Sequence, residues 1–105
     1  MFYDDGRVAC DDKEVRLRGY YFPWGTKRIA YTAIHSYTRR PMGRLRGQLR
    51  IWGSGDLVHW YNLDPKRTTK DTAFELRTRS RIRPVVTPDD PDAFENVLAA
   101  HVARD

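Results

Sequence analysis

The pattern of apolar and polar residues repeats every two positions through most of the chain. In "EVRLRGYY" one face carries Val15, Leu17, Gly19 and Tyr21, and the opposite face carries Glu14, Arg16, Arg18 and Tyr20. Such alternation is typical of a β-strand with one buried and one solvent-exposed side. Similar patterns predict strands between about residues 7 and 86, at 7–10, 14–21, 27–31, 34–38, 44–52, 57–61, 73–78 and 83–86.

Proline and glycine mark the turns between these strands. In "YYFPWGTK", Pro23 fixes φ and Gly25 tolerates positive φ, which are the residue choices of a tight turn between antiparallel strands. "RRPMGR" and "WGSGDL" carry similar turn signals. The aromatic residues around Pro23 are therefore expected to pack on neighbouring strands. The alternative is a platform on which bases or sugars stack.

The period changes near the end of the chain and predicts one amphipathic helix. Asp90 is suited to cap a helix, and Pro91 to occupy its first position. We expect the helix to run from about Pro91 to about Ala103, with its apolar stripe buried against the sheets. The stripe consists of Phe94, Val97, Leu98, His101 and Val102.

Strands followed by a single C-terminal helix resemble the pleckstrin-homology-like (PH-like) proteins of bacteria. The resemblance is carried by "VRLRGYYFPWGTKRIAYTAIHSYTRR" and by "RPVVTPDDPDAFENVLAAH", and it covers nearly the whole chain. It implies a seven-stranded antiparallel β-sandwich or barrel capped by the helix. Phosphoinositide-binding members of the family use basic residues on the loop between the first two strands. Here that loop is the acidic "CDDKEV", so the resemblance does not extend to a headgroup site.

Length and composition limit the possible functions. The 105 residues are enough for one domain over the whole chain, residues 1–105. Nineteen Lys and Arg against fourteen Asp and Glu give a net charge of +5, which favours anionic partners. No apolar run is long enough to span a membrane, and the first residues lack the layout of a signal peptide. We therefore expect a cytoplasmic location, either free or peripheral to the membrane.

No pattern of residues indicates catalysis. The single cysteine, Cys10, excludes an internal disulfide and is expected to be a small core residue. His35, His59 and His101 lie in different elements without the spacing of metal ligands. Nucleophile-elbow and phosphate-loop motifs are also missing from the sequence. We expect no enzymatic activity, no cofactor and no metal.

Basic clusters are the remaining candidates for binding. They suggest a non-enzymatic interaction module that binds a protein partner or an anionic membrane surface through basic loops. One alternative is that the arginines only form solvent-exposed faces of strands. The sequence also leaves open whether the chain forms a homo-oligomer. The other alternative is single-stranded nucleic-acid binding on an aromatic and basic face, which depends on where Tyr20, Trp24, Trp52 and Trp60 point. The candidate binding residues are Arg39, Arg40, Arg44 and Arg46 around one loop, and Lys66, Arg67 and Lys70 on another. Further on, Arg77, Arg79, Arg81 and Arg83 are expected along an exposed face.

Overall fold

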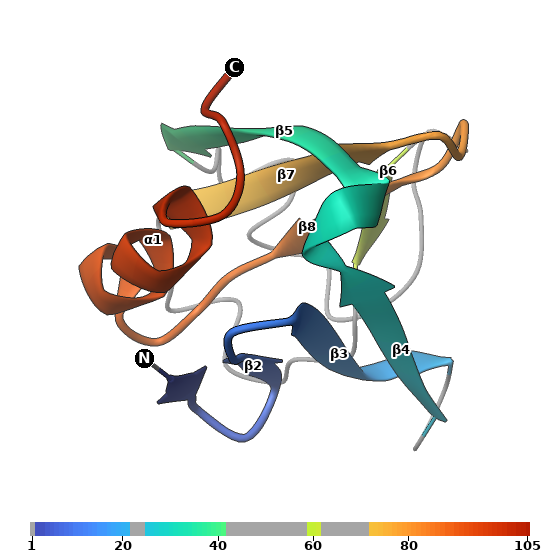
Figure 1. Ribbon diagram of the computed structural model, residues 1–105. Coiled ribbons are helices and arrows are strands. Elements are labelled where there is room, and N and C mark those ends of the chain that lie inside the picture. Colours follow the sequence, from blue (N-terminus) through green and yellow to red (C-terminus); the bar gives the residue numbers. More distant parts are fainter. Residues whose placement is uncertain (1, 22–24, 42–58, 62–71) are drawn as a thin grey trace.

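The computed structural model describes residues 2–21, 25–41, 59–61 and 72–105. Within these residues the chain is mainly β, with one C-terminal helix, as the sequence pattern predicts (Figure 1). The elements in chain order are β1 (Tyr3–Asp4), β2 (Val8–Cys10), β3 (Glu14–Tyr21), β4 (Gly25–Ala30), the 3-10 helix η1 (Tyr31–Ala33), β5 (Ile34–Pro41), β6 (His59–Tyr61), β7 (Thr72–Thr78), β8 (Arg83–Val86) and α1 (Pro91–Ala99). The predicted strand at 44–52 lies outside the described residues.

The first sheet contains β1, β2, β3 and β4 in that order, and each neighbouring pair is antiparallel. Leu17 is fully buried, as the alternation predicts. The alternation ends at Gly19, which has a φ of 76° and lies within a register shift between Arg18 and Tyr21. A bulge of this kind uses a residue that tolerates positive φ, and it changes which side chains face the core. Tyr20 is therefore buried and Tyr21 exposed, so the expected faces of the two tyrosines are wrong.

The second sheet has the order β5-β7-β8-β6. β7 is antiparallel to both neighbours, but β6 runs parallel to β8, which corrects the expectation of purely antiparallel strands. The parallel pair arises because β8 turns back from β7 and comes to lie between β7 and β6. Among the described residues no strand pairing joins the two sheets, so the expected barrel is not closed.

The core lies between the two sheets and α1, which stands beside both of them in Figure 1. Phe94 of α1 is fully buried. Its ring packs edge-on against Phe74 of β7, at 4.9 Å between centroids, and against Tyr3 of β1, at 5.6 Å. Leu98 is also fully buried, which confirms that the helix stripe faces the core. The helix thus holds one strand of each sheet.

Two aspartates fix the start of α1. The Oδ1 atom of Asp90 accepts a hydrogen bond from the Ala93 amide at 3.1 Å, which confirms the predicted cap. Asp5, in the turn between β1 and β2, accepts hydrogen bonds from the amide of Val8 at 2.9 Å and from that of Asp89 at 2.8 Å. One carboxylate therefore closes the β1–β2 turn and ties it to the residues before the helix.

The end of α1 differs from the prediction. The helix ends at Ala99 instead of about Ala103, and His101 is exposed beyond it. The chain then turns to the outer edge of β5. There the Tyr37 amide donates to the Ala103 carbonyl at 3.1 Å, and the Asp105 amide donates to the Tyr37 carbonyl at 2.7 Å. These contacts with β5 take the place of further helical turns.

Candidate functional site

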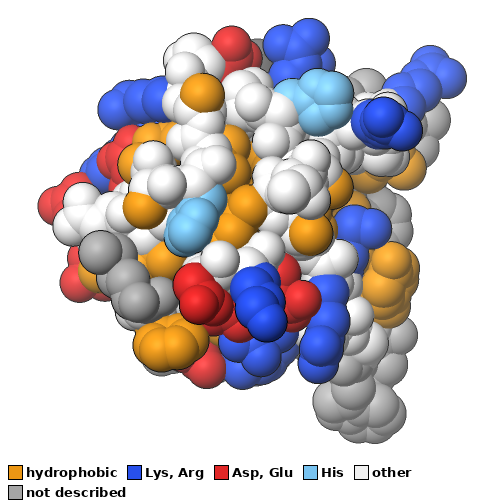
Figure 2. Space-filling view, in the orientation of Figure 1, with side chains coloured by type: hydrophobic (Ala, Val, Ile, Leu, Met, Phe, Trp, Pro, Cys, Tyr) orange, Lys and Arg blue, Asp and Glu red, His pale blue; other side chains and the backbone are white. Residues whose placement is uncertain are grey.

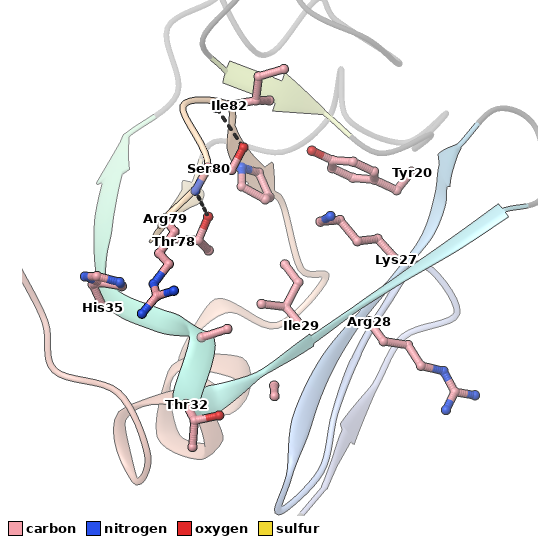
Figure 3. Close-up of a pocket in the computed structure, with 13 residues that line it drawn as sticks. Tyr20, Lys27, Arg28, Ile29, Thr32, His35, Thr78, Arg79, Ser80 and Ile82 are labelled. Carbon is pink, nitrogen blue, oxygen red and sulfur yellow. Dashed lines mark hydrogen bonds between the residues drawn. The ribbon is translucent and has the colours of Figure 1, made fainter.

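A hollow of about 510 Å³ lies between the first sheet and the turn that joins β7 to β8 (Figure 3). We call it the basic hollow. Its size is in the range of sites that take a small ligand or a few side chains of a partner. It is lined by Tyr20, Lys27, Arg28, Ile29, Ala30, Thr32, Ala33, His35, Thr78, Arg79, Ser80, Ile82 and Pro84.

Apolar and aromatic side chains form part of its lining. Ile29 and Pro84 are buried, and Tyr20 is only 7% exposed. Burial raises the pKa of the Tyr20 hydroxyl to about 12, so this group is neutral at neutral pH. Tyr20 reaches this position because the bulge at Gly19 turns it inward. The bulge therefore helps to build the hollow.

Lys27 enters the basic hollow from β4, as Figure 3 shows. Its ammonium nitrogen lies 5.4 Å from the ring centre of Tyr20 and 5.9 Å from that of Tyr21. It also donates a long hydrogen bond of 3.5 Å to the Tyr21 hydroxyl. The two rings pack edge-to-face, with centroids 5.3 Å apart. Aromatic rings attract a cation without cancelling its charge, so Lys27 is held in place and still positive.

The opposite wall is the turn between β7 and β8. The Ser80 amide donates to the Thr78 hydroxyl, and the Ile82 amide donates to the Ser80 hydroxyl, both at 3.1 Å. Side-chain hydroxyls that accept from the backbone two residues later are a recognised way to fix a tight turn. These bonds, dashed in Figure 3, fix the backbone that carries Arg79.

The Lys and Arg side chains that line the basic hollow give it a positive charge. Its lining contains Lys27, Arg28 and Arg79, and none of the lining residues is Asp or Glu. Arg28 points away in Figure 3 and lies 3.7 Å from a Glu14 oxygen, although its side chain is 69% exposed. Within the described part of the chain, Lys27 and Arg79 have no carboxylate within 4.0 Å. Figure 2 shows Lys and Arg side chains over β4 and around the β7–β8 turn. The hollow therefore favours anions.

Two of the residues predicted for binding, Arg39 and Arg40, are described, and both form ion pairs within the molecule. Arg39 forms ion pairs with Asp92 at 2.8 Å and with Glu95 at 2.7 Å, which link β5 to α1. Arg40 pairs with the buried carboxylate of Glu75 at 3.2 Å. Neither arginine lines the basic hollow. The other predicted residues, Arg44, Arg46, Lys66, Arg67 and Lys70, lie outside the described residues, so their role stays a prediction.

The strands on either side of residues 22–24, β3 and β4, are antiparallel neighbours. Tyr21 of β3 pairs with Gly25 of β4, which confirms antiparallel strands, while residues 22–24 lie outside the described part. A Cβ atom on Gly25 would lie 2.5 Å from the Cβ of Tyr21, so glycine is needed for this close approach. The pairing of β3 with β4 brings Lys27 to the tyrosines. In the sequence, Lys27 and Arg28 follow soon after an aromatic stretch. That position was the signal for a basic site, and the sequence prediction did not include these two residues.

Histidine and cysteine side chains show no catalytic arrangement in the described part. His101 stacks on Tyr31, with ring centroids 4.2 Å apart and planes 8° from parallel. His35 lines the basic hollow from β5. Cys10 is a buried core residue, as predicted, and burial raises the pKa of its thiol to about 11. No group of three or more His, Cys, Asp or Glu among the described residues is placed to hold a metal ion.

Comparison with protein families, with characterised proteins and with solved structures finds no match to this chain. In the part that the structure describes, no helix has the length and apolar character needed to cross a membrane. The function of the candidate site must therefore be inferred from its geometry and charge.

Proposed function

We propose that the chain is a non-enzymatic interaction module that binds an anionic group of its partner in the basic hollow. The observation that carries this proposal is the position of Lys27, which two tyrosine rings hold without a neutralising carboxylate in the described residues. Arg79 adds a second positive charge from the opposite wall, on a turn fixed by side-chain hydrogen bonds. Because ring contacts already restrict the Lys27 side chain, it loses little freedom when an anion binds.

The proposal keeps the general function expected from the sequence but moves it to another place. Arg39 and Arg40 each have an acidic partner inside the molecule, and binding an anion would compete with those ion pairs. Lys27 and Arg79 have no such acidic partner among the described residues. We also propose that the fold is an open form of the PH-like sandwich, because a helix follows the last strand through a Thr-Pro-Asp turn and packs against one strand of each sheet. A protein partner in the cytosol is consistent with the proposed interaction module.

Single-stranded nucleic-acid binding has less support from the described residues. It needs exposed aromatic side chains next to basic ones. Tyr20 is buried, and the structure does not describe the side chains of Trp24, Trp52 and Trp60. Tyr21, which is 54% exposed, is the one aromatic side chain beside Lys27 that bases would reach among the residues described.

The test is a titration with sodium pyrophosphate at constant ionic strength, followed by amide signals in a ¹⁵N–¹H NMR spectrum. We expect shifts concentrated at residues 26–33 and 78–82. Lys27→Gln and Arg79→Gln should each weaken binding by roughly three- to tenfold, as expected for the loss of one charge-assisted contact. Arg77→Gln is the matched control, because Arg77 lies near Asp105 and does not line the hollow.

The outcomes separate a site from general attraction to a basic protein. Equal weakening by Arg77→Gln and Lys27→Gln would mean that net charge alone attracts the anion. Shifts spread over the surface, or no binding at all, would also overturn the proposal.

A further inference from the structure

The outer edge of β4 borders the basic hollow. β4 is the last strand of the first sheet, and among the described strands it pairs with β3 alone. No other described strand covers its outer side. An uncovered edge strand presents backbone N–H and C=O groups that can pair with an added strand.

The pairing with β3 determines which backbone groups face outward. The Tyr31 amide donates to the Lys13 carbonyl at 3.1 Å, which makes these two residues a hydrogen-bonded antiparallel pair. Hydrogen-bonded and non-hydrogen-bonded pairs alternate along such a ladder. The pairs of Thr26, Arg28 and Ala30 with β3 are therefore of the non-hydrogen-bonded type, so the N–H groups of all three residues and the C=O groups of Thr26 and Arg28 point away from β3. The C=O group of Ala30, at the start of η1, accepts the first hydrogen bond of that helix. The side chains of all three residues are exposed.

A strand added to this edge would meet positive charge on both of its faces. On the inner face its side chains would enter the basic hollow, where Lys27 and Arg79 lie. On the outer face they would lie beside Arg28. Acidic side chains at alternating positions would match the inner cations, because successive residues of a strand point to opposite faces.

A second copy of the chain fits this edge poorly. Antiparallel pairing of two β4 strands would bring Lys27 and Arg28 of one copy close to the same residues of the other. Like charges on paired strands are destabilising, and basic residues on an edge are a known protection against self-association. The same charges favour an acidic strand.

We propose, resting on the proposed function of the basic hollow, that the partner is an extended acidic peptide segment of another protein that adds as a strand to the outer edge of β4. Its backbone pairs with Arg28 and Ala30, and its carboxylates enter the hollow near Lys27 and Arg79. The backbone hydrogen bonds supply the alignment, and the cations supply the preference for acidic sequences.

Ala30 offers a sharp test of the backbone pairing. Its φ of −63° and ψ of 143° are those of proline, and the preceding residue, Ile29, lies in an extended strand as proline requires. Ala30→Pro removes the outward N–H without changing a charge. Its melting temperature should be unchanged or slightly higher, because the native conformation already suits proline. Ala30→Ser keeps the N–H and is the matched control.

The probe is a capped synthetic peptide in which glutamate and valine alternate, with a peptide of the same composition but with all glutamates adjacent as control. We expect the alternating peptide to bind more tightly, and Ala30→Pro to weaken it about tenfold, as for the loss of one backbone hydrogen bond. Ala30→Ser should bind normally. Lys27→Gln should weaken both the peptide and pyrophosphate, whereas Ala30→Pro should leave pyrophosphate binding unchanged.

The two proposals fail in different ways. Suppose that pyrophosphate binds in the hollow, but the Ala30→Pro variant and the native chain bind the alternating peptide with equal affinity. Strand addition would then be wrong, and anion binding would stand. Equal affinity for both peptides would mean that charge alone drives binding and that the alternation of glutamates along a strand does not matter. Another outcome is that the native chain forms a dimer without peptide and that Ala30→Pro abolishes this dimer. That result would show that a second copy of the chain occupies the edge of β4. Single-stranded DNA binding more tightly than the peptide at equal salt would also overturn the proposal.

Discussion

Replacing Phe94 with alanine tests whether α1 holds the two sheets together. The Phe94 ring is fully buried and packs edge-on against Phe74 of the second sheet and Tyr3 of the first. Alanine would remove both aromatic contacts and leave a cavity between the helix and the strands. Because the three rings come from three separate elements, the surrounding structure has little freedom to close that cavity.

The expected loss is large for a chain of this size. Truncating a buried phenylalanine to alanine costs about 3–5 kcal/mol, and small domains have a total stability of about 5–15 kcal/mol. At about 4–8 °C per kcal/mol, the melting temperature of Phe94→Ala should fall on the order of 12–40 °C. Phe94→Leu fills part of the space and should lose markedly less.

Urea unfolding followed by circular dichroism measures this loss, provided that the slope with urea stays the same in all variants. Asn96→Ala is the control, because Asn96 is exposed on the same helix. We expect its stability to change by no more than about 0.5 kcal/mol. A loss below about 1 kcal/mol for Phe94→Ala would mean that α1 does not secure the sheets, since only an exposed or easily repacked side chain is lost so cheaply.

Two further predictions concern a carboxylate and a thiol. Burial alone would raise the pKa of Asp5, but hydrogen bonds from the Tyr3 hydroxyl and the Val8 amide, among others, hold it below its ordinary value. Its contribution is therefore present above the ordinary pKa and lost as pH falls through the lower folded value. Asp5→Asn should be less stable by about 1–3 kcal/mol at pH 7, and the difference should shrink below about pH 4; a constant difference between pH 7 and pH 2 in urea unfolding would contradict this. Because Cys10 is buried with a pKa of about 11, its thiol should react slowly with a disulfide reagent at pH 8 and quickly in urea. Fast reaction of the folded chain would show that β2 opens readily.

Local signals in the sequence predicted the elements whose causes are local. β8 spans Arg83–Val86, as the residue pattern predicts, and α1 begins at Pro91 because Asp90 caps it. The features that were missed depend on distant contacts. The helix ends early because the chain pairs with Tyr37, and β6 runs parallel to β8 because of the order in which strands enter the sheet. β1 spans only Tyr3–Asp4, too short for any periodicity to appear.

The candidate site was harder to predict than the fold. The sequence drew attention to runs of basic residues, but Arg39 and Arg40 are used in ion pairs inside the molecule. Lys27 and Arg79 lie in segments far apart in the sequence, and only the tertiary fold brings them to one hollow. The position of Tyr20 was also hidden, because a glycine in a strand does not reveal whether it forms a bulge.

The outer edges of β5 and β4 are protected in different ways, and the difference bears on function. The edge of β5 is covered by the end of the chain, through the hydrogen bonds of Ala103 and Asp105 with Tyr37. A covered edge excludes every partner alike. The edge of β4 has no such cover among the described residues and carries Lys27 and Arg28 instead. Charge repels basic strands, including a second copy of β4, but it attracts acidic ones. Of these two edges, the described residues cover that of β5 and leave that of β4 to its charges, and this is why we propose β4 as the edge that selects an acidic partner beside the hollow.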